Sequence, residues 1–307
     1  MRVLVTGAAG FIGKEIVLVL ESAGHEVVKL GRKAVAANSE TEDSNGEFYA
    51  LDLANKASVT SLPAISNVDA VIHAAGLGHQ FGKVSGEDFF SVNADGTQNT
   101  CDIALKLGAK RLILISSVSV YGNFANRSGD VGEDFECKPE GDYAESKLRA
   151  ELIAGKLCGE NGISLTILRP ATVVGEGDIG NVAKLISAID RRRFIWIGKG
   201  ENSKSLIDKN DVARACSEIL EKSKADFEVF NLSAKALKMR ELVEAISFAL
   251  GKKAPGLYLP ADLVKFFLDS ALKIFRFREI SNFRETLVKW LPDDVYSPEK
   301  IKTPYRF

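Results

Sequence analysis

Three glycines between a short apolar run and a helical segment, at the start of the chain, restrict this sequence more than any other feature. The segment VTGAAGFIG places Gly7, Gly10 and Gly13 directly after RVLV. Glycine permits a tight turn, close approach of the backbone to a ligand, and close packing of helix on strand. The free N–H groups at the start of the helix favour an anion such as a pyrophosphate. The pattern therefore predicts a dinucleotide-binding unit rather than a merely structural turn.

Strand-like and helix-like stretches alternate through the first half of the chain. Apolar runs such as those in HEVVKLGR, VDAVIHAAG, RLILISS and SLTILRPATVVG are separated by segments with helical periodicity. This alternation predicts a Rossmann-type α/β fold, a doubly wound parallel sheet with helices on both faces. After about residue 175 helical segments dominate. We expect a dinucleotide-binding domain over 1–175 and a smaller, mostly helical C-terminal substrate lobe over 176–307, interleaved with the last sheet elements.

The composition argues against several other classes of protein. Lys and Arg number 40 against 41 Asp and Glu, so no nucleic-acid partner is expected. The four cysteines, Cys101, Cys137, Cys158 and Cys216, lack CxxC spacing, which argues against a disulfide framework and a zinc site, and no metal is expected. The first residues are too interrupted by glycine for a signal peptide, and no apolar run approaches the ~20 residues of a membrane span. A cytoplasmic location is the default expectation.

The segment 263–275, LVKFFLDSALKIF, is strongly amphipathic. Such a helix is buried in a small lobe, buried in a dimer interface, or placed on a membrane surface. The sequence favours burial over membrane contact.

The residues after the second predicted strand indicate which dinucleotide binds. An acidic residue there would bind the ribose hydroxyls of NAD, but this chain has Gly31, Arg32 and Lys33. Two cations suit a 2′-phosphate, so NADP is favoured over NAD, with a solvated basic turn as the alternative. Asp52 and Leu53, which follow GEFYA, are candidates for the adenine edge, and the context favours this role for Asp52 over that of an ordinary turn carboxylate.

A serine pair and a YxxxK segment suggest a catalytic centre. Ser116 and Ser117 follow the apolar strand LILI, and the carboxyl ends of parallel strands face the ligand crevice. In DYAESK, Tyr143 and Lys147 are four residues apart and share one face of a helix. Alone, YxxxK is typical of an amphipathic helix. Combined with the glycine loop, it indicates groups placed beside a nicotinamide.

In this order the motifs resemble the extended branch of the short-chain dehydrogenase/reductase superfamily, which contains sugar-nucleotide epimerases, dehydratases and reductases. The resemblance covers residue 1 to about 215 and rests on TGAAGFIG, LDL, HAAG, VNADGT, ISSVSVYG, YAESK, LRPATVVG and NDVARA. The rest of the chain, which selects the substrate in that family, matches only loosely.

The resemblance implies that Tyr143 is a general acid/base assisted by Lys147 and Ser117. The pKa of a free tyrosine is ~10, and the Lys147 ammonium and an oxidised nicotinamide are expected to lower it. Lys147 would also bind the nicotinamide ribose. Ser117, preferred to Ser116 by its spacing from Tyr121, would stabilise charge on the substrate oxygen. Hydride transfer belongs to the nicotinamide.

The resemblance also implies a set of residues that line the cofactor. His73, in HAAG, is expected to be structural, and the residues after it to approach the cofactor through their backbone. The candidate set is Gly7, Ala9, Gly10, Phe11, Ile12, Gly13, Arg32, Asp52, Leu53, Ala74, Ala75, Gly76, Asn93, Tyr143, Lys147 and Pro170.

The stretch from GEGDIGNVAKLI to SLI resembles the substrate-lobe signature of nucleotide-sugar epimerases. It implies that Asn181 and Lys204 hold the nucleotide diphosphate, with Asn181 equally a candidate helix N-cap. Lysine would act there as a point charge rather than a fork. His79, with Gln80, and Ser117 are the candidates for contact with the sugar.

Several reactions stay open within this resemblance. Val118 and Ser119 stand where 4,6-dehydratases carry an acidic pair, so dehydration is disfavoured. A C4 epimerase, which returns its hydride, and a 4-ketoreductase, which consumes NADPH, both remain. The alternatives are a ketone reductase of hydroxysteroid or dihydroflavonol type and a non-catalytic dinucleotide sensor, the latter disfavoured because serine, tyrosine and lysine are all present. The resemblance also implies a homodimer built on the helices that contain VNADGT and YAESK.

Overall fold

The structure is a computed structural model of the 307-residue chain, and it describes residues 1–32, 47–60, 65–78, 85–122, 129–274 and 290–305. No helix within these ranges combines the length and the apolar character that crossing a membrane requires.

Within the described residues, seven parallel strands form the main sheet, in the order β11-β6-β5-β4-β1-β2-β3. The chain starts with β1 inside the sheet and adds β2 and β3 on one side of it. It then adds β4, β5, β6 and β11 on the other side. The order therefore reverses between β1 and β4, where doubly wound sheets bind their ligands. This confirms the predicted Rossmann-type fold. The strands are β1 (Arg2–Thr6), β2 (Glu26–Gly31), β3 (Phe48–Ala50), β4 (Ala70–His73), β5 (Arg111–Ile115), β6 (Ser164–Pro170) and β11 (Phe227–Leu232).

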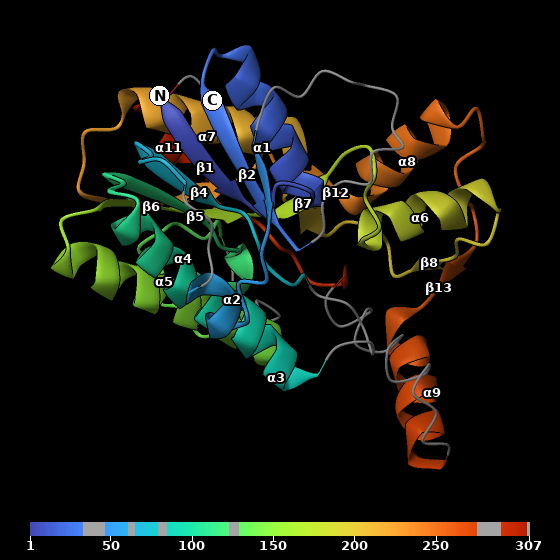
Figure 1. The fold of residues 1–307 in the computed structure, drawn as a ribbon. Coiled ribbons are helices and arrows are strands. Elements are labelled where there is room, and N and C mark those ends of the chain that lie inside the picture. Colours follow the sequence, from blue (N-terminus) through green and yellow to red (C-terminus); the bar gives the residue numbers. More distant parts are fainter. Residues whose placement is uncertain (33–46, 61–64, 79–84, 123–128, 275–289, 306–307) are drawn as a thin grey trace.

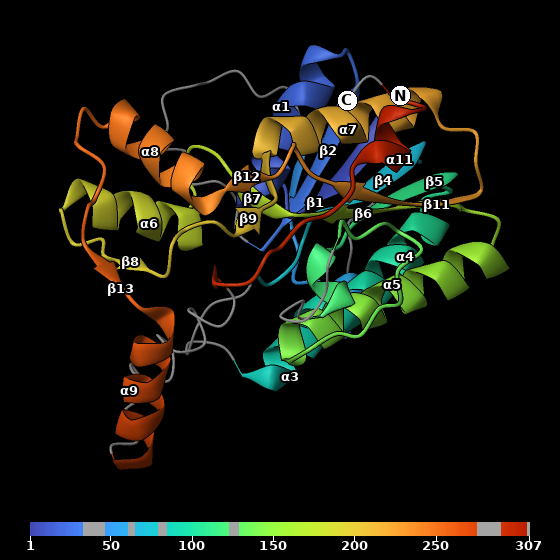
Figure 2. The same ribbon diagram turned by 180° about the vertical axis from the view of Figure 1, so that it is seen from behind.

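Helices cover both faces of this sheet (Figures 1 and 2). Alternate residues of a strand point to opposite faces, so Val3 and Val5 of β1 enter one core and Leu4 enters the other. The first core is closed by α1 (Phe11–Ser22), α7 (Lys209–Lys222) and α11 (Glu299–Lys302). The second is closed by α4 (Gly96–Lys106) and α5 (Asp142–Glu160), with α2 (Lys56–Thr60) beside them.

The long helix predicted around VNADGT contains a change of helical type. It consists of α3 (Gly86–Phe89), a π-helical stretch η1 (Phe90–Asp95), and α4. Ser85 begins it with a capping box to Asp88. The π turn places Asn93 in the interior of the protein, where it is 1% exposed.

The strand predicted over SLTILRPATVVG is two strands in different sheets. β6 ends at Pro170, and β7 (Thr172–Val174) pairs with β10 (Leu206–Asp208). Proline lacks an N–H for the ladder, which favours the end of a strand there. Ala171 makes the last backbone bond to the main sheet, donating to the Leu232 carbonyl at 2.9 Å.

The remaining elements form a smaller, mostly helical lobe beside the sheet (Figure 1). The sequence pattern of GNVAKLISAIDRRRFIWIG, residues 180–198, predicts a helix throughout. The helix stops at Asp190, because Arg192 adopts the left-handed conformation at φ 55° and the chain then enters β8. α7 and β11 return to the main domain, and the proposed boundary at residue 175 stays a prediction. The lobe contains α6 (Asn181–Asp190), α8 (Met239–Ala249), α9 (Ala261–Ile274), β8 (Trp196–Ile197), β9 (Ser203–Lys204), β12 (Leu237–Lys238) and β13 (Tyr258–Leu259).

The amphipathic helix α9 projects away from the rest of the lobe (Figures 1 and 2). Leu263, Phe266 and Phe267 are exposed, while Val264 lines a cavity in the lobe. The expectation that this segment is buried in the small lobe is therefore wrong for these three side chains.

Candidate functional site

The glycine loop between β1 and α1 has no room for a side chain at Gly7 or at Gly13. Gly7 has a positive φ of 67°, and a Cβ there would lie 2.6 Å from the backbone nitrogen of Ala75. A Cβ on Gly13 would lie 2.0 Å from the Gly7 carbonyl oxygen. The loop thus packs directly on the segment after β4. Gly10 is the N-cap of α1, and having no side chain it leaves the N–H groups that start the helix without an N-cap side-chain acceptor.

The candidates for the adenosine half lie after β2 and β3. Arg32 is exposed just past the end of β2, and Lys33 falls outside the described residues. Asp52 is exposed and accepts from the Ala54 amide at 3.1 Å, which is the turn geometry expected of an ordinary turn carboxylate. Leu53 is buried, and its carbonyl accepts from the Asn99 side chain at 2.7 Å.

His73 is enclosed by threonine hydroxyls at the end of β4. Thr6 Oγ1 lies 2.7 Å from Nδ1, and Thr97 Oγ1 lies 3.1 Å from Nε2. The Thr97 hydroxyl already donates to the Asn93 carbonyl, so it accepts from Nε2–H and leaves Nδ1 as an acceptor. Burial, with the charge of Lys147 as a second cause, lowers the pKa of His73 to about 3. This neutral, fixed ring agrees with the structural role predicted for it.

Asn93 connects the loop after β4 to the helix that carries YxxxK. Its Oδ1 accepts from the Leu77 amide at 2.7 Å, and its Nδ2 donates to Ser146 Oγ at 2.9 Å. Ser146 in turn donates to the Tyr143 carbonyl at 2.8 Å. Sequence reasoning missed Ser146, which lies inside the motif as one of its variable positions.

Lys147 is buried at the centre of this arrangement. Its Nζ donates to the Ile115 carbonyl at the end of β5, at 2.9 Å. A Cβ on Gly76 would lie 3.1 Å from this Nζ and 3.2 Å from Asn93 Oδ1, so the glycine leaves room for both. Burial lowers the pKa of Lys147 to about 8, and the carboxylate of Glu151 opposes that shift.

Tyr143 and Ser117 form a hydroxyl pair at the same edge of the sheet. Ser117 caps the short 3-10 helix η2 (Val118–Tyr121) by accepting from the Ser119 amide at 3.1 Å. The Tyr143 ring packs edge to face on Phe89, with centroids 5.8 Å apart. Burial raises the pKa of Tyr143, and its hydrogen bond with Ser117 opposes the rise.

The direction of this shift differs from the prediction that Lys147 makes the phenol more acidic. Burial is the larger effect because it removes solvent from the phenolate, and it also lowers the pKa of the lysine. In the protein alone, the environment of Tyr143 therefore favours the neutral phenol. The neighbouring Lys147 loses its proton at a lower pH than an exposed lysine does.

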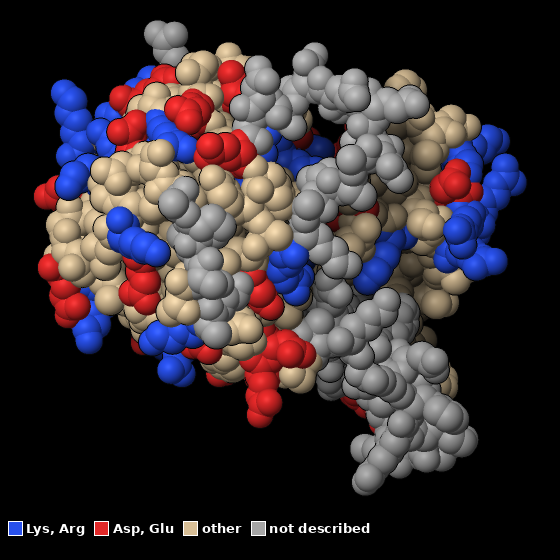
Figure 3. All heavy atoms as spheres, viewed as in Figure 1, with Lys and Arg blue, Asp and Glu red and all other residues tan. Residues whose placement is uncertain are grey.

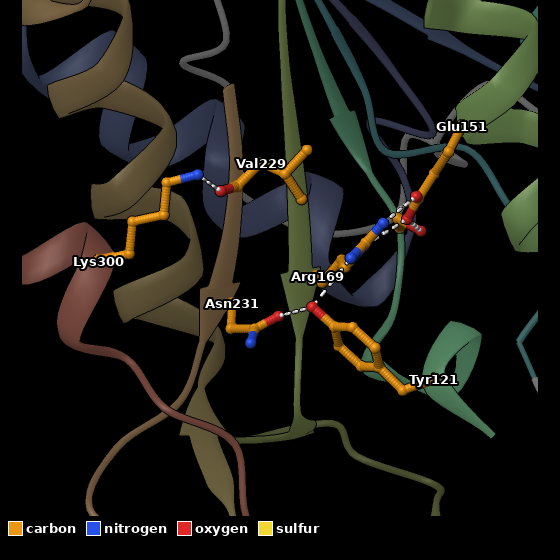
Figure 4. Close-up of polar contacts among 7 residues, drawn as sticks. Tyr121, Glu151, Arg169, Val229, Asn231 and Lys300 are labelled. Carbon is orange, nitrogen blue, oxygen red and sulfur yellow. Dashed lines mark hydrogen bonds and ion pairs between the residues drawn. The ribbon is translucent and has the colours of Figure 1, made fainter. Parts of the chain in front are cut away.

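A buried ion pair joins β6 to α5, the helix that carries Tyr143 and Lys147 (Figure 4). Arg169 on β6 donates to Glu151 Oε1 from Nε at 3.0 Å and to Oε2 from Nη2 at 2.6 Å. Ser116 donates to the same Oε1 at 2.5 Å. Ser116 is thus committed to this pair, which agrees with the choice of Ser117 as the serine of the candidate site.

The ion pair continues into a chain of hydrogen bonds toward β11 (Figure 4). Arg169 Nη1 donates to Tyr121 Oη at 2.9 Å, and Tyr121 donates to Asn231 Oδ1 at 2.8 Å. The guanidinium also lies 4.9 Å from the centroid of the Tyr121 ring. Although burial opposes its charged form, the Glu151 carboxylate and Tyr121 keep the pKa of Arg169 above its ordinary value. Sequence reasoning gave this network no role, although an arginine in the apolar run TILRP is a signal for it.

The C-terminal lobe contains a cavity of about 450 Å³ between α6, β8 and the start of α9. Asn181 lines it, as does Trp290. Asn181 is the first residue of α6 rather than its N-cap, which is Gly180, so the capping alternative is wrong. The other lining residues are Lys184, Leu185, Ala188, Arg193, Phe194, Ile195, Trp196, Ile197, Gly200, Asn202, Met239, Leu259, Val264 and Leu291.

The second predicted phosphate ligand, Lys204, is placed differently. It is buried, with Nζ 3.9 Å from Asp294 Oδ2 and 5.9 Å from the Trp290 ring centroid. Burial lowers its pKa and Asp294 opposes the shift. Asn181 therefore lines the cavity, whereas Lys204 does not line it and instead contacts Trp290, which does. His79 and Gln80 fall outside the described residues.

Lys209, at the start of α7, joins the cofactor loop to the segment that leads to this cavity. Its Nζ donates to the Glu176 carbonyl at 3.0 Å, pairs with Glu15 at 3.2 Å, and lies 5.7 Å from the Phe11 ring centroid. Gly177 also approaches Phe11. The sequence carried no recognisable signal for this lysine.

Comparison with known proteins gives one family and several relatives. The model of the "NAD dependent epimerase/dehydratase family" matches residues 3–233. The chain is 27% identical to UDP-glucose 4-epimerase of Bacillus subtilis, over 88% of this chain and 89% of that protein. It is 33% identical to N-acetyl-α-D-glucosaminyl-diphospho-ditrans,octacis-undecaprenol 4-epimerase of Escherichia coli O157:H7, over 57% of this chain and about half (53%) of that relative. The solved structure of MoeE5 in complex with UDP-glucose and NAD is similar, with a TM-score of 0.70, 28% identity, and coverage of 85% of this chain and 86% of that one.

Proposed function

Because the chain belongs to the NAD-dependent epimerase/dehydratase family, we propose that it inverts C4 of a nucleotide-diphosphate sugar with NAD as its cofactor. The observation that carries the proposal is the Ser117–Tyr143 hydroxyl pair beside buried Lys147, at the carboxyl edge of the sheet and next to the glycine loop. Such an edge is where this fold binds a dinucleotide and its substrate.

The residues of the glycine loop fit a dinucleotide. Gly7 and Gly13 pack closely on the backbone and place no side chain between it and a ligand, and the start of α1 presents N–H groups suited to the pyrophosphate. Asn93 and Lys147 are the polar groups on the nicotinamide side. A bound nicotinamide would supply the hydride acceptor for the carbinol and the hydride donor for the ketone, and inversion would require the ketone to turn so that the hydride returns to its opposite face.

Tyr143 is proposed to move the proton that accompanies the hydride. As the phenolate, its Oη takes the hydroxyl proton of the sugar on oxidation, and as the resulting phenol it returns that proton on reduction, while Ser117 Oγ holds the same sugar oxygen. The raised pKa of Tyr143 favours the neutral phenol, which suits the proton-donating half of the cycle. Lys147 provides the cation that stabilises the phenolate in the other half, and it keeps its proton below its pKa of about 8.

The lobe cavity is proposed to hold the nucleotide. Trp196 and Trp290 offer aromatic surface to a base, and Asn181 offers an amide for directional hydrogen bonds. Lys184 and Arg193, at the same cavity, are the cations proposed to meet the diphosphate. Lys204 is proposed to act indirectly, by fixing Trp290 and the Asp294 segment.

A second candidate is a 4-ketoreductase that consumes NADPH. Exposed Arg32, directly after β2, is the observation that favours it, because a guanidinium at this place suits a 2′-phosphate. The two candidates differ in cofactor and in turnover, and one set of assays separates them.

The test is purified protein analysed for bound dinucleotide and then incubated with UDP-glucose or UDP-N-acetylglucosamine without added cofactor. An epimerase is expected to carry NAD and to form the C4 epimer, and Tyr143→Phe should abolish conversion while cofactor stays bound. Oxidation of added NADPH by a 4-keto nucleotide sugar, with weaker NADPH binding in Arg32→Gln, would instead identify the reductase. A protein that binds no dinucleotide would contradict both.

A further inference from the structure

The helix α9 presents large apolar side chains to solvent although its base is anchored on the lobe. Leu263, Phe266 and Phe267 are 53%, 66% and 66% exposed, and the two phenyl rings meet edge to face with centroids 5.9 Å apart. Val264, on another side of the helix, lines the lobe cavity. Exposed apolar side chains gathered on one projecting element mark a binding surface.

This apolar surface continues along the strand that leads into α9. Leu257 and Tyr258 are exposed, and so are Leu259 and Ile195, although these last two also line the lobe cavity. β13 pairs with β8, and the Tyr258 ring stacks on Trp196 at 5.7 Å with an interplanar angle of 5°. The exposed residues are therefore held on a paired strand.

Exposed cations lie at the start of the same two strands. Arg191 and Arg192 precede β8, and Lys253 precedes β13, all exposed to solvent. Because β8 and β13 are parallel, these ends lie together, and the Lys252–Asp190 ion pair joins them. Figure 3 shows Lys and Arg gathered along this edge of the lobe, which is the edge formed by α6 and α8.

We propose that this face of the lobe docks on a membrane surface that contains anionic lipids. α9 and β13 supply exposed aromatic side chains, and the cations lie at the opposite end of β13 from α9. Apolar side chains and cations together are the chemistry of interfacial segments, in which apolar groups enter the headgroup layer and cations meet lipid phosphates. The docking is peripheral, with α9 in the headgroup region. A second copy of the chain fits this face less well, because symmetry-related faces would bring two groups of cations together.

The experiment is co-sedimentation of the full chain with vesicles of phosphatidylcholine alone and of phosphatidylcholine mixed with phosphatidylglycerol. Binding to the anionic vesicles is expected, and added salt should weaken it. Replacing both phenylalanines, Phe266→Ser with Phe267→Ser, should lower the partition coefficient on the order of a hundredfold. Neutralising the cations in R191Q/R192Q/K253Q should lower it by roughly a hundredfold on anionic vesicles, and far less on neutral ones.

Two control variants test whether vesicle binding depends on this face or on any exposed apolar or cationic side chain. Leu18→Ser removes an exposed apolar side chain from α1, and K14Q/R149Q/K156Q removes three exposed cations from the main domain. Neither control should change vesicle binding, and thermal melts should show all variants folded. Absence of wild-type binding, or equal binding by the Phe266→Ser, Phe267→Ser variant, overturns the proposal. If that variant instead loses self-association of a protein that ignores vesicles, a second copy covers the face. The test does not depend on the proposed reaction.

Discussion

Replacing Glu151 by glutamine tests the buried ion pair in a nearly isosteric way. The change keeps the oxygen that accepts from Ser116 but puts an N–H₂ where Oε2 now accepts from Arg169 Nη2 at 2.6 Å. The two side chains are 5% and 8% exposed, so the guanidinium would lose its counter-ion in a nearly dry environment. Breaking a buried pair from one side costs ~3–5 kcal/mol. The lower end applies here, because Tyr121 still holds Arg169 by a hydrogen bond and by its ring.

The expected result of Glu151→Gln is a destabilisation of about 3 kcal/mol, which for a chain of this length lowers Tm by about 5 °C. Activity should respond as well, because Glu151 raises the pKa of Lys147 against the effect of burial. Removing the carboxylate should move the alkaline limb of the kcat profile to lower pH. The variant keeps the other titratable side chains described around this site, which are His73 on β4, Tyr143 on α5, Arg169 on β6, Tyr121 on η2 and Cys137.

Thermal melts and pH profiles of the proposed reaction are the assays, with the double variant E151Q/R169M as the matched control. Loss of both charges should recover part of the lost stability, because no uncompensated charge stays buried. A single variant within about 1 kcal/mol of wild type, with an unmoved alkaline limb, would refute the reasoning.

The remaining predictions concern the cofactor loop and two buried bases. Gly13→Ala should weaken dinucleotide binding about tenfold to a hundredfold from ~1–3 kcal/mol of overpacking, measured by fluorescence titration, whereas Gly155→Ala, which has open space, should not. His73 should make the protein acid-sensitive: its pKa falls from 6.5 to about 3 on folding, so stability on the order of several kcal/mol is present above pH 6.5 and is lost as pH falls toward 3. Denaturant titrations across that range should show a shallower loss for His73→Asn. The rate should fall as pH rises through about 8, where Lys147 deprotonates, and Lys147→Arg should move that limb upward.

The parts of the fold predicted well are those in which one short pattern determines the outcome. The glycine loop and the alternation of apolar runs with helical segments predicted the main sheet, because local steric and burial requirements enforce both. The break at Pro170 and the end of α6 at Asp190 were missed. Each depends on one residue whose neighbours continue the pattern, and the pairing of β7 with β10 joins segments distant in the sequence.

The sequence predicted which residue types form the candidate site, but not how the protein interior shifts their pKa values. The sequence predicted Ser117, Tyr143 and Lys147 as a group, but not that burial would raise the pKa of the tyrosine and lower that of the lysine. Burial depends on the packing of β4, β5 and α5 around these groups, which no local pattern contains. Glu151 was missed for the same reason, since an acidic residue on a long helix is usually exposed.

The path of the chain through the sheet has a consequence for engineering the substrate lobe. After β6 the chain leaves to build α6, β8 and β9, returns for α7 and β11, and leaves again for α8, β13 and α9 before ending at α11. The lobe is thus made of two insertions, each tied to the main domain at both ends. The specificity that we propose for its cavity cannot be transplanted as one contiguous cassette. A chimaera that exchanges only the first insertion would combine half of one cavity wall with half of another, so a graft must carry both insertions together.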